Sequence, residues 1–166
     1  MKALVAYYSQ TGNTEKVARA VYDGINLPGK DIIPIKEAGA VEGYEVIFCG
    51  FPVQAHSVPD KVEFFLRQIP NGKKIALFAT HGSLRGGHLA ITAFYKALSL
   101  TSKQTVLGTF GCRGRVKSEI IDALLNKAEH REWALEARGA IEHPDEADLE
   151  DAKDWAGAMI SKARSK

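Results

Sequence analysis

The sequence predicts an α/β fold in which helices cover both faces of an open, doubly wound parallel sheet of five strands. The first observation is that five short apolar segments alternate with amphipathic segments along the 166 residues. The second is that three of the apolar segments are almost uninterrupted, as in strands buried on both faces. The third is that no repeat, low-complexity tract or linker divides the chain, so we expect a single domain over residues 1–166.

Strand-like and helix-like segments follow one another in a regular order. The expected strands cover residues 3–8, 31–35, 45–51, 74–80 and 105–112. The segments between them show the period of helices that bury one face, marked by Val17 and Val21, by Val62 and Leu66, and by Phe94 and Leu98. We expect one long helical stretch after the fifth strand and a final helix whose first turn contains Pro144. Around residues 38–43 no clear period appears, which predicts a short helix or a loop.

Composition and charge exclude several classes of function. A formal net charge of +2 with scattered basic residues does not predict nucleic-acid binding. No apolar run approaches the roughly 18 residues of a membrane span, and the first residues lead straight into a strand. We therefore expect no membrane span, no signal peptide and a cytoplasmic location. Two cysteines and five histidines show no metal-ligand spacing, so we assign no metal site and no catalytic side chain.

A polar turn joins the first strand directly to the first helix. Its residues supply hydroxyls, amides and a glycine, namely Ser9, Thr11 and Thr14, Gln10 and Asn13, and Gly12. These groups and the unpaired N–H groups of the helix start meet at the positive end of the helix dipole, which favours a phosphate. The turn has no lysine and matches neither GxxxxGK[ST] nor GxGxxG. It predicts a monophosphate held by neutral donors.

In a doubly wound sheet, ligands bind beyond the carboxyl ends of the strands, where the strand order reverses. The loops at residues 9–14, 51–59, 81–88 and 113–116 should therefore converge. The segment SQTGNTEKVA at residues 9–18 resembles the phosphate-binding loop of flavodoxins, whose pattern [ST]-x-T-G-x-T is followed by a helix. The resemblance extends through GFPVQAHSVP after the third strand and THG after the fourth. It implies a flavodoxin-like sheet of strand order 2-1-3-4-5 that binds one FMN.

The resemblance also implies a role for each of three loops. The first would hold the FMN phosphate, the second would line one side of the isoalloxazine ring, and the third would line the other side and bond the pyrimidine edge through its backbone. The first loop comprises Ser9, Gln10, Thr11, Gly12, Asn13 and Thr14. The second comprises Phe51, Pro52, Val53, Gln54, Ala55 and His56. The third comprises Thr80, His81, Gly82, Ser83, Gly86 and Gly87.

The second and third loops depart from the family pattern. Flavodoxins commonly place aromatic side chains on both sides of the ring, whereas these loops offer only Phe51, His56, His81 and His88. Phe51 is alternatively a core residue at a strand end, and His56 and His81 are alternatively solvent-facing. One or both faces of the ring would then be less covered, which leaves room for a substrate or a partner's cofactor.

Positive charge is expected at the rim of this site. Arg85, Arg113 and Arg115 are either ordinary solvated charges or a docking point for an acidic partner protein, an anionic substrate or a nicotinamide phosphate. Because positive charge stabilises an added electron, we predict a less negative reduction potential than that of an acidic flavodoxin. Cys112 is either a small buried strand residue or a thiol whose pKa is lowered by its position beside Arg113.

Two functions of different classes follow from this interpretation. The favoured one is an FMN-binding electron-transfer protein that passes electrons to or from a partner redox enzyme. The alternative is an NAD(P)H-dependent FMN-containing reductase of a quinone or similar acceptor. A third hypothesis is an FMN-free binding module. The short chain without a nicotinamide fingerprint favours the carrier, and the poor aromatic cover favours the enzyme.

Overall fold

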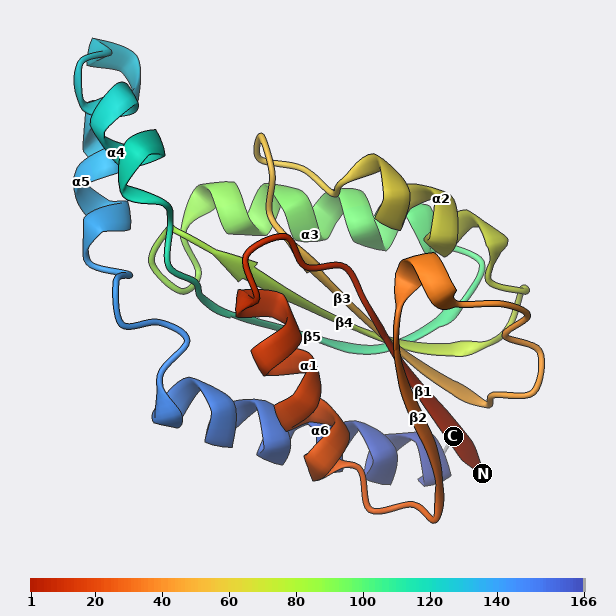
Figure 1. Cartoon of the computed structure of the whole chain (residues 1–166). Coiled ribbons are helices and arrows are strands. Elements are labelled where there is room, and N and C mark those ends of the chain that lie inside the picture. Colours follow the sequence, from red (N-terminus) through yellow and green to blue (C-terminus); the bar gives the residue numbers. More distant parts are fainter. Residues whose placement is uncertain (166) are drawn as a thin grey trace.

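The computed structural model describes residues 1–165; Lys166, at the end of the expected domain, and the side chain of Leu89 lie outside the described part. Five parallel strands form one sheet in the order β2-β1-β3-β4-β5, which confirms the predicted fold class and strand order (Figure 1). Their bounds are Lys2–Tyr7 for β1, Gly29–Pro34 for β2, Val46–Pro52 for β3, Lys74–His81 for β4 and Thr105–Arg113 for β5. Each lies within two residues of its expected position.

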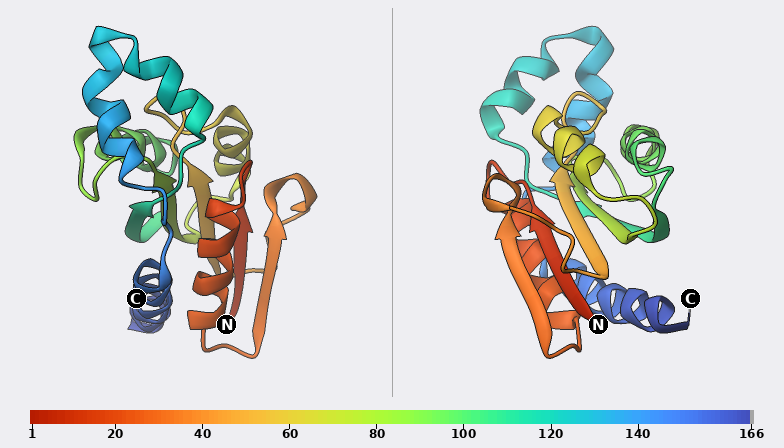
Figure 2. Two further views of the ribbon diagram at one scale, coloured as in Figure 1. Left: turned by 60° about the vertical axis from the view of Figure 1, so that its left-hand side comes forward. Right: turned by 90° about the vertical axis from the view of Figure 1, so that its right-hand side faces the viewer.

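Helices cover both faces of this sheet. α1 (Asn13–Gly24) and α6 (Glu146–Ser165) lie together on one face, and α2 (Asp60–Gln68) and α3 (His88–Leu100) lie on the other (Figures 1 and 2). Successive residues of a strand point to opposite faces, so each central strand contributes to two cores. Val5 and Phe48 pack under α1 and α6, whereas Leu4 and Ile47 pack under α2 and α3. Burial on both sides explains why β1, β3 and β4 read as uninterrupted apolar runs.

The crossover from β2 to β3 leaves part of one sheet face thinly covered. In the described chain it contains a single 3₁₀ turn, η1 (Ile35–Glu37), followed by a loop. This outcome falls within the two alternatives that the sequence left open. All six residues of β2 are half-buried. This strand lies at the edge of the sheet beside β1 alone, and the segment that follows it forms no α-helix that would cover it.

The long helical stretch expected after β5 is divided by a turn. The chain instead forms a helical hairpin, residues 118–138, made of α4 (Ser118–Leu125), the 3₁₀ turn η2 (Ala128–His130) and α5 (Arg131–Arg138). The two α-helices pack on each other and bury Ile121 against Ala134 and Ala137. The hairpin projects away from the sheet (Figures 1 and 2).

The start of α6 differs slightly from expectation. The Asp145 carboxylate accepts the backbone N–H of Asp148 at 2.9 Å, and the Asp148 carboxylate accepts that of Asp145 at 3.1 Å. This reciprocal pair caps the helix, so Pro144 precedes the helix rather than lying in its first turn. None of the helices described here is long and apolar enough to cross a membrane.

Candidate functional site

A cavity of about 460 Å³ opens at the carboxyl edge of the sheet, beside β1, where the strand order reverses. We call it the switch-point cavity. Four segments converge on it, as the sequence predicted: the turn after β1, the ends of β3 and β4, and the segment after β5. Its lining residues are Gln10, Thr11, Asn13, Pro52, Val53, Gln54, Thr80, His81, Gly82, Gly114, Arg115, Val116, Lys117 and Ile120. The volume lies within the range of small-molecule and cofactor sites.

The turn after β1 has the geometry of an anion site. Gly12 caps α1 with a φ of +89°, a conformation that side-chain-bearing residues rarely adopt. Its N–H donates to the Ser9 hydroxyl oxygen at 3.1 Å, and its carbonyl accepts the N–H of Lys16 at 3.0 Å. Among the residues described, the N–H groups of Asn13 and Thr14 have no protein acceptor. The positive end of α1 is therefore open to a ligand.

Thr14 supports this turn from within. Its side chain is buried, and its hydroxyl oxygen lies 2.8 Å from that of Thr80 at the end of β4. The Thr14 hydroxyl is thus committed to another protein group, whereas the exposed Thr11 lines the cavity. Ser9 also acts within the turn, through the N–H of Gly12.

The segment after β3 contributes one wall of the cavity. The N–H of Val53 donates to the carbonyl of Thr80 at 2.8 Å, and the Gln54 side-chain amide donates to that of Gln10 at 2.6 Å. These bonds hold the second loop against β4 and against the turn at residues 9–14. The Phe51 side chain is fully enclosed and packs on Phe94 with ring centroids 6.2 Å apart. Phe51 therefore belongs to the core, and its side chain cannot face a ligand.

A tight turn follows at residues 54–57. Gln54 and Ser57 exchange N–H···O bonds of 3.1 and 2.8 Å, and the two residues between them have positive φ values, +46° for Ala55 and +62° for His56. This pattern is that of a type I′ turn, which normally selects Asn and Gly. Ala55 and His56 lie exposed at its tip, outside the lining of the cavity. The turn stores backbone strain beside the site.

The loop after β4 follows the expected path only at its start. Thr80, His81 and Gly82 line the cavity, but Ser83, Gly86 and Gly87 turn away from it. Arg85 draws the loop past the end of β5, since its Nε donates to the carbonyl of Gly111 at 2.9 Å and its Nη1 pairs with Asp151 on α6 at 2.8 Å. The Ser83 hydroxyl accepts the indole N–H of Trp133 at 3.2 Å, and Gly86 and Gly87 lead into α3.

His81 is buried rather than solvent-facing. Its Nδ1 lies 2.9 Å from the carbonyl oxygen of Ser83. Burial lowers the pKa of His81, because the charged imidazolium would lose its hydration. The side chain is therefore a neutral wall of the cavity at neutral pH.

The segment after β5 takes the place that the third loop was expected to fill. Gly114, Val116, Lys117 and Ile120 line the cavity, although the residue-by-residue assignment omitted them. A Cβ at Gly114 would lie 3.1 Å from Asn13 Nδ2 and 3.2 Å from Thr80 Cβ, so a larger residue here would have to displace these neighbours slightly. The Asn13 side chain donates to the carbonyl of Arg115 at 2.9 Å and joins this segment to the turn at residues 9–14. Gly114, which directly follows a strand, is the feature of the sequence that could have pointed to this segment.

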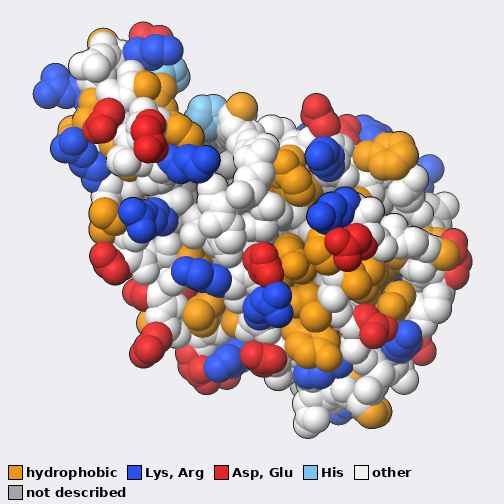
Figure 3. Space-filling model, viewed as in Figure 1, with side chains coloured by type: hydrophobic (Ala, Val, Ile, Leu, Met, Phe, Trp, Pro, Cys, Tyr) orange, Lys and Arg blue, Asp and Glu red, His pale blue; other side chains and the backbone are white. Residues whose placement is uncertain are grey.

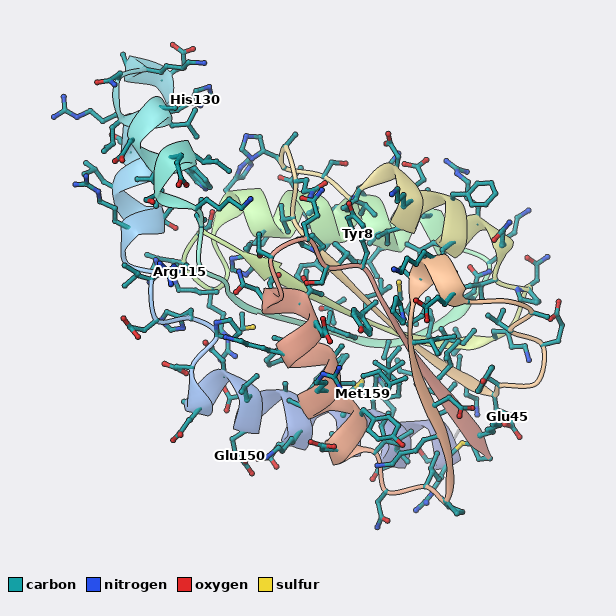
Figure 4. All side chains as sticks on the ribbon, viewed as in Figure 1. Tyr8, Glu45, Arg115, His130, Glu150 and Met159 are labelled. Atoms are coloured by element: carbon teal, nitrogen blue, oxygen red, sulfur yellow. The ribbon has the colours of Figure 1, made fainter. Side chains whose placement is uncertain are left out.

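Positive charge at the cavity comes from fewer residues than expected. Arg115 lines it (Figure 4), together with Lys117. Arg85 is paired with Asp151, and the Arg113 guanidinium donates to the carbonyls of Glu136 at 2.6 Å and Gly139 at 3.0 Å, at the end of α5. Their roles are structural, because both side chains hold loops or helices in place.

Cys112 is not an activated thiol. Burial raises the pKa of Cys112 to about 12. Burial also raises the pKa of Cys49, which lies inside β3. Both cysteines are free and buried, so they act as small core residues.

Comparisons with known proteins agree with this geometry. Residues 4–157 match the flavodoxin domain family. The chain is 31% identical over 174 aligned positions to the flavodoxin-like domain-containing protein BilS of Clostridioides difficile (strain CD3), and the alignment covers 98% of each chain. It is 33% identical over 87 positions to a flavodoxin of Clostridium beijerinckii, covering 47% of this chain and 63% of that one.

Solved structures share the fold. A flavodoxin from the domain Archaea has a TM-score of 0.65 at 19% identity and 99% coverage of both chains. A flavoprotein of Lactobacillus acidophilus NCFM, solved in complex with FMN, has a TM-score of 0.56 at 17% identity, covering 66% of this chain and 92% of that one. Because the family match spans most of the sequence and a relative aligns with nearly all of it, this chain belongs to the flavodoxin family.

Proposed function

We propose that this chain, as a single domain over residues 1–166, binds one FMN non-covalently in the switch-point cavity and passes electrons to or from a partner redox protein. The observation that carries the proposal is the turn at residues 9–14, where Gly12 holds a φ of +89° and unpaired N–H groups open beside a cavity of about 460 Å³. Membership of the flavodoxin family supports FMN as the ligand, and one structural relative was solved with FMN bound.

The lining residues fit this cofactor. The N–H groups of Asn13 and Thr14, with the Thr11 hydroxyl, would hold the phosphate, while Ser9 and Thr14 keep the turn in shape. Val53 and Val116 belong to two segments that would bound the ring. When bound, FMN supplies the redox chemistry, and the chain sets its access and electrostatic surroundings. No Phe, Tyr or Trp lines the cavity among the described residues, so the ring would be less covered than between aromatic side chains.

FMN titration of the purified protein tests the proposal. Thr11→Ala should weaken FMN binding by about 10-fold or more, since a hydrogen bond to a charged group contributes roughly 1.5–3 kcal/mol. Thr92→Ala is the matched control, because Thr92 is an exposed α3 residue whose hydroxyl bonds only its own helix. Equal affinity of Thr11→Ala and wild type would contradict the phosphate assignment. A protein that takes up no FMN would support the binding-module hypothesis instead.

A second function is favoured by one further observation. An open cavity of about 710 Å³ adjoins the first and is lined by Thr11, Asn13, Arg115, Lys117, Ser118 and Glu119. Two cations beside the proposed FMN phosphate give room and charge for the phosphate of a nicotinamide nucleotide. Anaerobic mixing of the FMN-loaded protein with NADH or NADPH separates the two functions. Rapid bleaching of the flavin absorbance by the nucleotide alone supports an NAD(P)H-dependent reductase. Bleaching of the flavin only after a reductase is added supports the carrier.

A further inference from the structure

A second, apolar cavity lies on the other side of the phosphate turn. It measures about 670 Å³ and is bounded by the end of β1, η1 and α2. It exists because the crossover from β2 to β3 provides a 3₁₀ turn where other crossovers provide a helix. Hydrophobic side chains gather on this side of the molecule in Figure 3. The cavity is separate from the switch-point cavity, with which it shares no lining residue.

Aromatic side chains dominate its walls. Tyr8, Phe64 and Phe65 line it together with Tyr7 and Ile35. Phe65 is buried, but Phe64 is 67% exposed, which is unusual for a large apolar side chain at the mouth of a cavity. Tyr8 lies where the chain leaves β1, near α2 (Figure 4). Volume and apolar lining are those of a small-molecule site.

Two acidic and two basic side chains line this cavity, namely Glu15, Asp60, Lys36 and Lys61. Lys61 Nζ lies 5.8 Å from the centroid of the Tyr8 ring, and Lys61 takes part in no ion pair among the residues described. The carboxylate of Glu15 is paired with Arg19 at 2.7 Å. Asp60 occupies the first turn of α2, where the helix dipole offsets its charge. Lys36 pairs with Glu37 at 3.6 Å, so Lys61 is the lining cation that has no ion pair among the described residues and lies beside an aromatic wall.

We propose that this cavity is a second binding site, for a planar aromatic carboxylate. The ring system would pack against Tyr8 and Phe64, and the carboxylate would pair with the ammonium group of Lys61. An aromatic ligand matches the walls, and an anionic group matches the ammonium group of Lys61 beside the Tyr8 ring. The proposal does not depend on what occupies the switch-point cavity.

Amide NMR locates the site. 2-Naphthoate is titrated into the FMN-saturated protein while backbone N–H signals are followed. Saturable shifts are expected at Tyr8, Ile35 and Phe64, with residues 114–117 unaffected. Shifts at residues 114–117 instead, or shifts that never saturate, overturn the proposal.

Two variants test the contacts, with the neutral isostere 2-naphthamide as a second probe. Lys61→Gln should weaken 2-naphthoate about two- to five-fold and leave 2-naphthamide unchanged, because only the carboxylate loses a partner. Phe64→Ala should weaken both probes about equally. Lys127→Gln and Leu135→Ala, at exposed positions of the helical hairpin, are the matched controls and should change neither. Equal weakening of both probes by Lys61→Gln, or no effect of Phe64→Ala, contradicts the assigned contacts.

Discussion

The side-chain hydroxyl oxygens of Thr14 and Thr80 lie 2.8 Å apart in a buried hydrogen bond. The bond joins the first turn of α1 to the end of β4 and so fixes the phosphate turn beside the switch-point cavity. Thr80→Val keeps the shape of the side chain but leaves a buried hydroxyl without its partner. We expect the free energy of unfolding to fall by about 1–3 kcal/mol, measured in urea without FMN.

The double variant Thr14→Val with Thr80→Val provides the control for this pair. Replacing both partners removes the unpaired hydroxyl, so the double variant should be more stable than the sum of the two single losses predicts. Additive losses would show that the two hydroxyls do not interact in solution.

Stability should depend on pH through His81. Its pKa is lowered from 6.5 by burial, so the unfolded chain takes up a proton more readily than the folded one. The contribution of His81 to the free energy of unfolding is fully present above pH 6.5, the ordinary pKa of histidine. It is lost as the pH falls toward the lower pKa that His81 has in the folded protein. Unfolding experiments between about pH 8 and 5 should therefore show falling stability. His81→Gln should flatten this slope, and His130→Gln, at a partly exposed position, should not. An unchanged slope in His81→Gln rules out the assignment.

The reduction potential of the proposed FMN site should respond to Arg115 and not to Arg85. Arg115 lines the cavity, whereas Arg85 is paired with Asp151 at 2.8 Å. A cation near the flavin stabilises the added electron, so Arg115→Gln should make the potential more negative. Arg85→Gln is the control and should shift it less. A spectroelectrochemical titration of the two variants measures the difference, and a larger shift in Arg85→Gln would contradict the charge assignment.

The turn at residues 54–57 is expected to gain stability from glycine. His56 holds a φ of +62° at the second central position, where a left-handed conformation costs roughly 1–2 kcal/mol for a side-chain-bearing residue. Glycine removes this cost but loses roughly 0.5–1 kcal/mol of chain entropy. His56→Gly should therefore raise the free energy of unfolding by about 0.5–1 kcal/mol. A decrease would mean that residue 56 does not hold this conformation in solution.

The strands and the phosphate turn could be predicted because local sequence determines them. A strand buried on both faces must be apolar throughout, and this requirement fixed the positions of β1, β3 and β4. Gly12 and its neighbouring hydroxyls marked the turn in the same local way. Side chains along β3 alternate between the two faces of the sheet, and this alternation also predicts where Phe51 lies. Phe51 shares its face with Ile47 and Cys49, in the core under α2 and α3.

The features of the fold and the site that the sequence did not predict depend on contacts between residues far apart in the chain. Arg85 pairs with Asp151, 66 positions away, and draws the loop after β4 from the cavity. Arg113 bonds the carbonyls at the end of α5 and anchors the helical hairpin, where the periodicity predicted only a long helical stretch. Neither partner is visible in a local pattern. The segment at residues 114–117 consequently fills a position assigned to another loop.

The placement of α6 determines when the protein is able to fold during its synthesis. Ala152, Ala156 and Ile160 complete the core around Val5 and Phe48, two residues that the ribosome adds more than a hundred positions earlier. Until residues 146–165 have left the exit tunnel, the nascent chain presents part of that apolar sheet face to solvent or to a chaperone. The sheet therefore closes only after translation of its last helix, and a ribosome stalled before residue 146 would hold an unfinished, aggregation-prone chain.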